Sequence, residues 1–220
     1  MSTGQGSVIG CGYCAFSRDI RRCTCGVPGC PFALLLSRSA DFTDYYDALK
    51  LQLTHAQDVR LAITLMQVLW DSGESGGWLS EMGPKQVLLQ AGIGDAQVTN
   101  LAAEFMARAY NASTVEPETR AVWDVQQLAA PFDGSALVEW LYDDVPDSPA
   151  ANVGRTDGKD VHECPRREPA SQNQMKDFLE GRGVVQHCRW ASWPNAMVKC
   201  ESKTCPSDWG PWPGSPAGGE

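Results

Sequence analysis

Residues 42–70 have the sequence FTDYYDALKLQLTHAQDVRLAITLMQVLW. Apolar side chains recur in this stretch at steps of three and four residues, which places them on one face of an α-helix. Asp41 is a suitable cap for the start of this helix, and the turn-forming run at 72–77 ends it. The stretch therefore predicts a long amphipathic helix that packs against other helices.

Four shorter helices are predicted after it, at 84–90, 95–111, 117–128 and 133–141, because Pro or Asp precedes a run of apolar residues in each case. The connections between them are short, which is typical of antiparallel bundles. We therefore predict a mainly α fold, an antiparallel helical bundle flanked by small cysteine-rich, zinc-stapled modules. Its predicted core contains Leu49, Leu53, Ile63, Met66, Leu69, Leu101, Phe105, Trp123, Leu137 and Trp140.

Composition divides the chain into five segments. The sequence predicts a cysteine-rich zinc-binding module at 1–38, an acidic helical bundle at 39–144 and a polar linker at 145–160. A second Cys/His module is predicted at 161–205, followed by a tail rich in Pro, Gly and Trp at 206–220. No run of 18 apolar residues is present, so no membrane span is expected.

Charge follows a similar division. Residues 39–154 contain 17 acidic and 5 basic residues, whereas residues 1–38 contain four arginines and one aspartate. An acidic surface repels nucleic acid and attracts basic proteins. A protein partner, basic in character, is therefore predicted, while the arginines of 1–38 leave nucleic-acid binding by that module as an alternative.

The nine cysteines are clustered at the two ends of the chain, and their number is odd. No secretory signal precedes them, so we expect an intracellular location, in the cytoplasm or the nucleus, where thiols stay reduced. Clustered thiols with nearby histidines then favour zinc. The candidate ligands are Cys11, Cys14, Cys23, Cys25 and Cys30 near the start, and His162, Cys164, His187, Cys188, Cys200 and Cys205 near the end.

A thiol enzyme is the alternative interpretation of the first cluster. Cys11-Gly12-Tyr13-Cys14 resembles the active-site tetrapeptide of thioredoxin-fold disulfide isomerases. The longer string CGYCAFS resembles the segment CGSCWAFS of papain-family cysteine proteases. These resemblances imply that Cys11 or Cys14 acts as a nucleophile. Three further cysteines follow within 16 residues of Cys14, and this favours the metal interpretation.

The sequence therefore predicts a non-enzymatic zinc-binding protein that takes part in protein–protein interaction or assembly, such as an accessory protein of a virus or mobile element. No complete set of catalytic residues is apparent, which favours this function over an enzyme. Two similar strings, WASWP at 190–194 and WGPWP at 209–213, contain tryptophans next to proline. Aromatic side chains of this kind supply contact area at low entropic cost, so Trp209 and Trp212 are the candidate partner-binding residues.

Overall fold

A computed structural model describes residues 2–143, 145–154, 160–188 and 201–202. The chain forms a seven-stranded sheet in the order β1-β2-β3-β6-β4-β5, with β7 paired to β6, and every strand pairing in it is parallel. The strands are β1 Ser2–Thr3, β2 Arg22–Gly26, β3 Gln86–Gly92, β4 Ser113–Glu116, β5 Gln126–Ala129, β6 Ala136–Tyr142 and β7 Glu201–Ser202.

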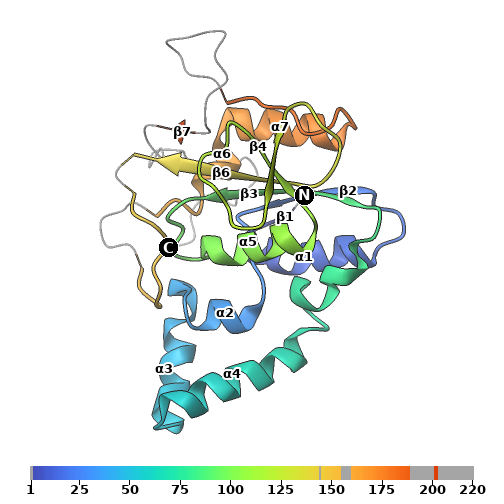
Figure 1. Ribbon diagram of the computed structural model, residues 1–220. Coiled ribbons are helices and arrows are strands. Elements are labelled where there is room, and N and C mark those ends of the chain that lie inside the picture. The colour runs from blue at the N-terminus through green and yellow to red at the C-terminus, as the bar shows by residue number, and fades with distance from the viewer. Residues whose placement is uncertain (1, 144, 155–159, 189–200, 203–220) are drawn as a thin grey trace, which may run out of the picture.

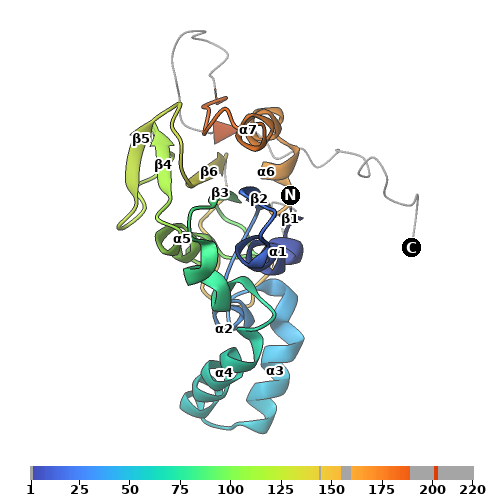
Figure 2. The same ribbon diagram turned by 90° about the vertical axis from the view of Figure 1, so that its right-hand side faces the viewer.

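Helices cover both faces of this sheet (Figure 1). The α-helices are α1 Gln5–Phe16, α2 Phe32–Leu36, α3 Thr43–Gln52, α4 Ala56–Trp70, α5 Asn100–Ala109, α6 Cys164–Arg167 and α7 Pro169–Leu179, and two 3₁₀ segments are η1 Ala40–Phe42 and η2 Ser75–Met82. Figure 2 shows α1 and α5 on one side of the sheet and α6 and α7 on the other, with α3 and α4 extending away from the strands.

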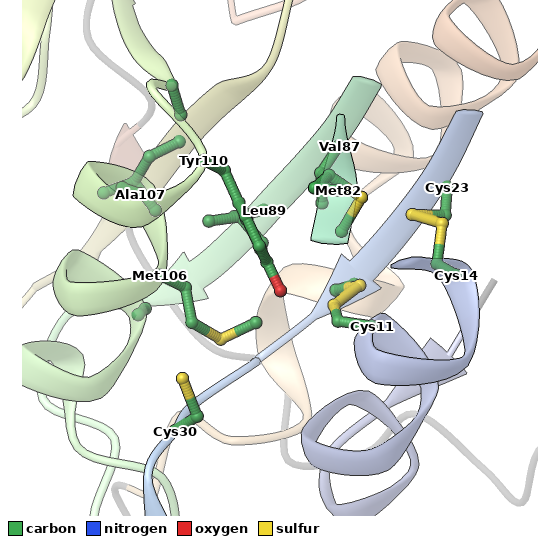
Figure 3. Packing of buried hydrophobic residues seen from close by; sticks show 14 of the residues in the cluster. Cys11, Cys14, Cys23, Cys30, Met82, Val87, Leu89, Met106, Ala107 and Tyr110 are labelled. Carbon is green, nitrogen blue, oxygen red and sulfur yellow. A yellow bond between two sulfur atoms is a disulfide. The ribbon is translucent and has the colours of Figure 1, made fainter. Parts of the chain in front are cut away.

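The strand β3 lies at the centre of the sheet and has apolar neighbours on both faces. Val87 and Leu89 face α1 and α5, where they pack with Met106 and Tyr110 of the segment around α5 (Figure 3). Leu88 faces the opposite way and belongs to the cluster that contains Phe178 of α7. Parallel strands that are buried on both faces have continuous apolar sequences, and β3 is an example.

The prediction of an antiparallel helical bundle is wrong, because the structure is an α/β fold built on a parallel sheet. Residues 84–90 contain most of β3, residues 117–128 contain the start of β5, and residues 133–141 contain most of β6. Short apolar runs do not distinguish a buried strand from a buried helix by periodicity, and this ambiguity produced the error. The prediction of a small zinc-stapled module beside the helices is also wrong for residues 1–38, since β1 and β2 are strands of this same sheet.

The long predicted helix at 42–70 is present as α3 and α4, with a break between Gln52 and Ala56. The helix α4 buries Val59 and Ile63 and leaves the opposite side open. Three residues of the predicted core are exposed, namely Leu69 (75%), Phe105 (40%) and Trp123 (78%), whereas Ile63, Leu137 and Trp140 are buried.

Candidate functional site

The carboxyl ends of β1, β2, β3 and β6 lie at one edge of the sheet because these strands are parallel. Open parallel sheets bind ligands at this edge. The chain places Gly4 directly after β1, Asp95 shortly after β3, and His162 in the segment between β6 and α6. Residues that are far apart in sequence are thereby brought together at a single site.

Asp95 is a buried carboxylate whose two oxygen atoms have different partners. Its Oδ1 accepts hydrogen bonds from the backbone N–H groups of Gln97 and Val98, both at 2.8 Å. Its Oδ2 lies 2.8 Å from Nδ1 of His162 and accepts a hydrogen bond from the N–H of that ring nitrogen. The local turn after β3 therefore fixes the carboxylate, and the carboxylate fixes the orientation of the imidazole ring.

His162 is 6% exposed, and its backbone N–H donates to Oδ1 of Asp160 at 3.1 Å. Burial lowers the pKa of His162, but the hydrogen bond and negative charge of Asp95 outweigh that effect, so the pKa is raised above its ordinary value. Since Nδ1 donates to Asp95, Nε2 carries the lone pair in the neutral form of the ring. The ring is thus a base with a defined reactive atom.

Nε2 of His162 faces the turn between β1 and α1. Gly4 has φ 56° and ψ −132° there, a conformation that residues with a side chain rarely adopt. A Cβ atom placed on Gly4 would lie 2.9 Å from Nε2 of His162. The next residue, Gln5, begins α1, so its N–H, the first donor of the helix, has no carbonyl partner within the helix.

A pocket of about 460 Å³ opens beside this histidine. Its polar lining comes from Gln5, Asp41, Gln97 and His162, and its apolar lining from Val8, Phe32, Leu35, Phe42, Tyr45 and Val98. A second pocket of about 130 Å³ shares Gln5, Phe32 and Phe42 with the first and extends to Trp70. The site thus combines a base, helix N–H groups and an apolar space large enough for a small organic ligand.

Four of the five cysteines near the start of the chain form disulfides and not a zinc site. Cys11 is bonded to Cys25, and Cys14 to Cys23. Residues three apart share a face of a helix and residues two apart share a face of a strand, so both pairs meet where α1 packs on β2. Cys30 is a free, buried thiol, and burial raises its pKa (Figure 3).

The prediction of bound zinc is wrong, because no group of His, Cys, Asp and Glu side chains in the described part of the chain can hold a metal ion. Cys164 and Cys188 are disulfide-bonded, and His187 is paired through Nε2 with Oδ2 of Asp177 at 2.6 Å. His162 belongs to the pair with Asp95. Cys200, Cys205, Trp209 and Trp212 lie outside the described residues.

The sequence predicts His162 as a zinc ligand, whereas the structure pairs it with Asp95. Neither Gly4 nor Asp95 is predicted as a site residue from the sequence. Asp95 was expected only to cap a helix. The signal that would have found the site is the order in the chain: a strand–turn–helix with small residues, then an acid after a buried strand, then a histidine after a later strand. No family model, curated protein or solved structure matches the chain.

Proposed function

We propose that this chain binds carboxylic esters at the carboxyl edge of the sheet and hydrolyses them with His162 as the base. The observation that carries the proposal is the buried Asp95–His162 pair, with Nε2 directed at the turn between β1 and α1. The order of Gly4, Asp95 and His162 along the chain is that of nucleophile, acid and histidine in α/β-hydrolase sheets. The likeness to those hydrolases lies in the parallel sheet and in the order of the three residues along the chain, and it is an analogy.

The proposed reaction uses water, because Gly4 has no side chain that could attack. Nε2 of His162 takes a proton from water, and the water oxygen forms a bond to the ester carbonyl carbon. The N–H of Gln5, in the first turn of α1, stabilises the negative charge that develops on the carbonyl oxygen. The carbon–oxygen bond to the alcohol then breaks, and His162 returns the proton to the leaving alkoxide.

The lining of the pocket favours neutral esters with an apolar acyl group. The rings of Phe32 and Phe42 and the side chain of Leu35 provide the apolar wall. Asp41 lines the same pocket, and Asp160 lies next to His162 through its bond to the backbone. These carboxylates repel anions, so the carboxylate product should bind the pocket more weakly than the neutral ester and should leave it readily.

The test is hydrolysis of p-nitrophenyl esters of increasing acyl length by the full chain and by His162→Gln. We expect His162→Gln to lose about 10²–10⁴-fold in kcat/KM, the usual contribution of a positioned base. His187→Gln is a matched control, because His187 is also paired with an aspartate but is not part of the pocket. Equal activity of the native chain and His162→Gln would contradict the proposal.

Interaction with a basic protein partner or with nucleic acid remains a prediction from charge alone. Among the described residues, no helix has the length and apolar character needed to cross a membrane. The intracellular location also remains a prediction, and the disulfides Cys11–Cys25 and Cys14–Cys23 favour an oxidising compartment instead. Non-reducing peptide mapping of the protein from its natural source would decide between the two compartments.

A further inference from the structure

We infer that position 4 is the nucleophile position of this site. Because glycine occupies this position, the site lacks the nucleophile needed for covalent catalysis, while the base His162, its partner Asp95 and the N–H of Gln5 are present. The inference deepens the proposed function, on which it relies for the role of His162. Gly4 stands at the position where a residue with a hydroxyl group would act as the nucleophile. The ligands are carboxylic esters, and the probes are fluorophosphonates, whose adducts with a serine hydroxyl mimic the tetrahedral intermediates of ester hydrolysis.

The backbone at Gly4 is held on both sides by hydrogen bonds. Its N–H donates to the carbonyl oxygen of Gly26 at 3.0 Å, which continues the pairing of β1 with β2. Its carbonyl oxygen accepts from the N–H groups of Ser7 and Val8 in α1. The sharp strand-to-helix turn with φ 56° is therefore fixed by its neighbours, and it aims position 4 at the base.

The hydroxyl groups already present near this turn have other partners. The hydroxyl of Ser7 is buried and donates to the carbonyl oxygen of Gly26 at 2.8 Å. The hydroxyl of Thr3 accepts from Nη1 of Arg166 at 2.9 Å, and that of Ser2 donates to Sγ of Cys25 at 3.8 Å. None of these hydroxyls is hydrogen-bonded to His162 in the described structure, so position 4 is the place where a nucleophile would meet the base.

The distance of 2.9 Å from a Cβ at position 4 to Nε2 of His162 is shorter than ordinary contact. The atom that must yield is the far end of a side chain, since the next contact of that Cβ is Cε1 of the same ring at 3.6 Å. A serine side chain would therefore require a shift of the imidazole, which Asp95 holds through Nδ1, and it would be strained by the backbone conformation with φ 56°. The Oγ atom, one bond beyond Cβ, would then be within hydrogen-bonding reach of Nε2.

In Gly4→Ser, the covalent steps follow from these positions. Oγ of the new serine attacks the carbonyl carbon of an ester, its proton passes to Nε2 of His162, and the alcohol leaves with that proton. Water then hydrolyses the acyl-serine by the same route. With a fluorophosphonate, the Oγ–P bond forms, the P–F bond breaks and fluoride leaves, while the proton passes through His162 to solvent.

The experiment compares four full-length proteins: the native chain, Gly4→Ser, Gly4→Ala, and Gly4→Ser combined with His162→Gln. Each is treated with a fluorophosphonate, and the adduct is measured by intact mass and located by peptide mapping. We expect a single adduct at position 4 in Gly4→Ser and none in the native chain or Gly4→Ala. Adding His162→Gln should slow labelling by about 10²–10⁴-fold.

A folded Gly4→Ser protein that is not labelled would overturn the inference. Gly4→Ala carries the same Cβ without the hydroxyl, so its circular dichroism and Tm report whether the turn accepts a side chain. Unfolding of both variants would also overturn the inference, since a nucleophile position must accept a side chain. Labelling of Gly4→Ser in a protein whose native form hydrolyses no ester would refute the proposed function and leave this inference intact.

Discussion

At the scale of single residues, His162 is the group whose charge state should control the chemistry near neutral pH. Burial acts to lower its pKa, and the hydrogen bond and charge of Asp95 raise it above the ordinary value of 6.5. Arg166 opposes this rise and Asp160 supports it, and the carboxylate of Asp41 also interacts with the ring. Ester hydrolysis needs the neutral ring, so its rate should increase as pH rises through this raised pKa.

Asp95→Asn should move that pH dependence. Without the carboxylate, burial of the ring is no longer outweighed, so the pKa of His162 should fall and the rising limb of kcat/KM should shift to lower pH. A residue with only a structural role would change the rate without shifting the limb. Asp177→Asn, which removes the partner of His187, serves as the control. An unchanged limb in Asp95→Asn would show that Asp95 does not position the base.

The same pair affects stability with a defined sign. A histidine with a raised pKa in the folded state stabilises the fold fully at pH values below its unfolded pKa, and this contribution is lost as pH rises through the folded pKa. At this scale the sequence predicted Asp95 as the cap of a helix, but α5 begins at Asn100, and Oδ1 of Asp95 accepts from the N–H groups of Gln97 and Val98 in the turn before that helix. The bond of Oδ2 to His162 joins residues 67 positions apart, and no local pattern encodes such a pairing.

At the scale of elements, two disulfides attach α1 to β2, and α1 begins directly after the turn at Gly4. Each of them closes a short loop and should stabilise the protein by about 2–4 kcal/mol. For a chain of this size, removing Cys14–Cys23 by the double change Cys14→Ser and Cys23→Ser should lower Tm by roughly 4–16 °C. Thermal unfolding followed by circular dichroism, without reductant, measures the effect.

A reductant should lower the Tm of the native chain further than that of the double variant, because the native chain loses Cys14–Cys23 as well as Cys11–Cys25. An equal Tm for the native chain and the double variant under oxidising conditions would contradict a stabilising role for Cys14–Cys23.

From their spacing alone, the same cysteines are predicted to bind a metal ion. Two thiols three residues apart are compatible with both a zinc knuckle and one face of a helix. The cysteines of β2, which lie opposite them, make these thiols disulfide partners.

The elements themselves were predicted unevenly. The amphipathic run at 42–70 indicated helix correctly: α4 buries Val59 and Ile63, and α3 packs beside them through the partly buried Tyr46 and Leu49. The runs that became β3 and β6 are buried on both faces, so they lack the alternation that marks a half-exposed strand. Their apolar side chains match a helical pattern over seven residues as well as a strand pattern. Pairing with neighbouring strands, which is not local information, determines their structure.

At the scale of the whole molecule, the site is assembled from loops that follow three different strands, so it exists only when the sheet is complete. A ligand that binds only the folded chain stabilises it by about 2.7 kcal/mol at 100 times its Kd. A methyl ketone with the acyl length of the preferred ester should therefore raise Tm in a single transition. The matched fatty acid should raise Tm less, because the carboxylates of Asp41 and Asp160 repel it. Equal shifts for the two compounds would contradict this assignment of the pocket.

The dispersal of Gly4, Asp95 and His162 along the chain also affects how long the protein persists. Proteases cut the transiently opened state, and its population falls as the free energy of unfolding rises. Since an occupied site opposes separation of the strands that carry it, cells rich in the ligand should degrade the protein more slowly than cells that lack it. The abundance of the chain would then follow the supply of its own ligand, even where the amount synthesised stays constant.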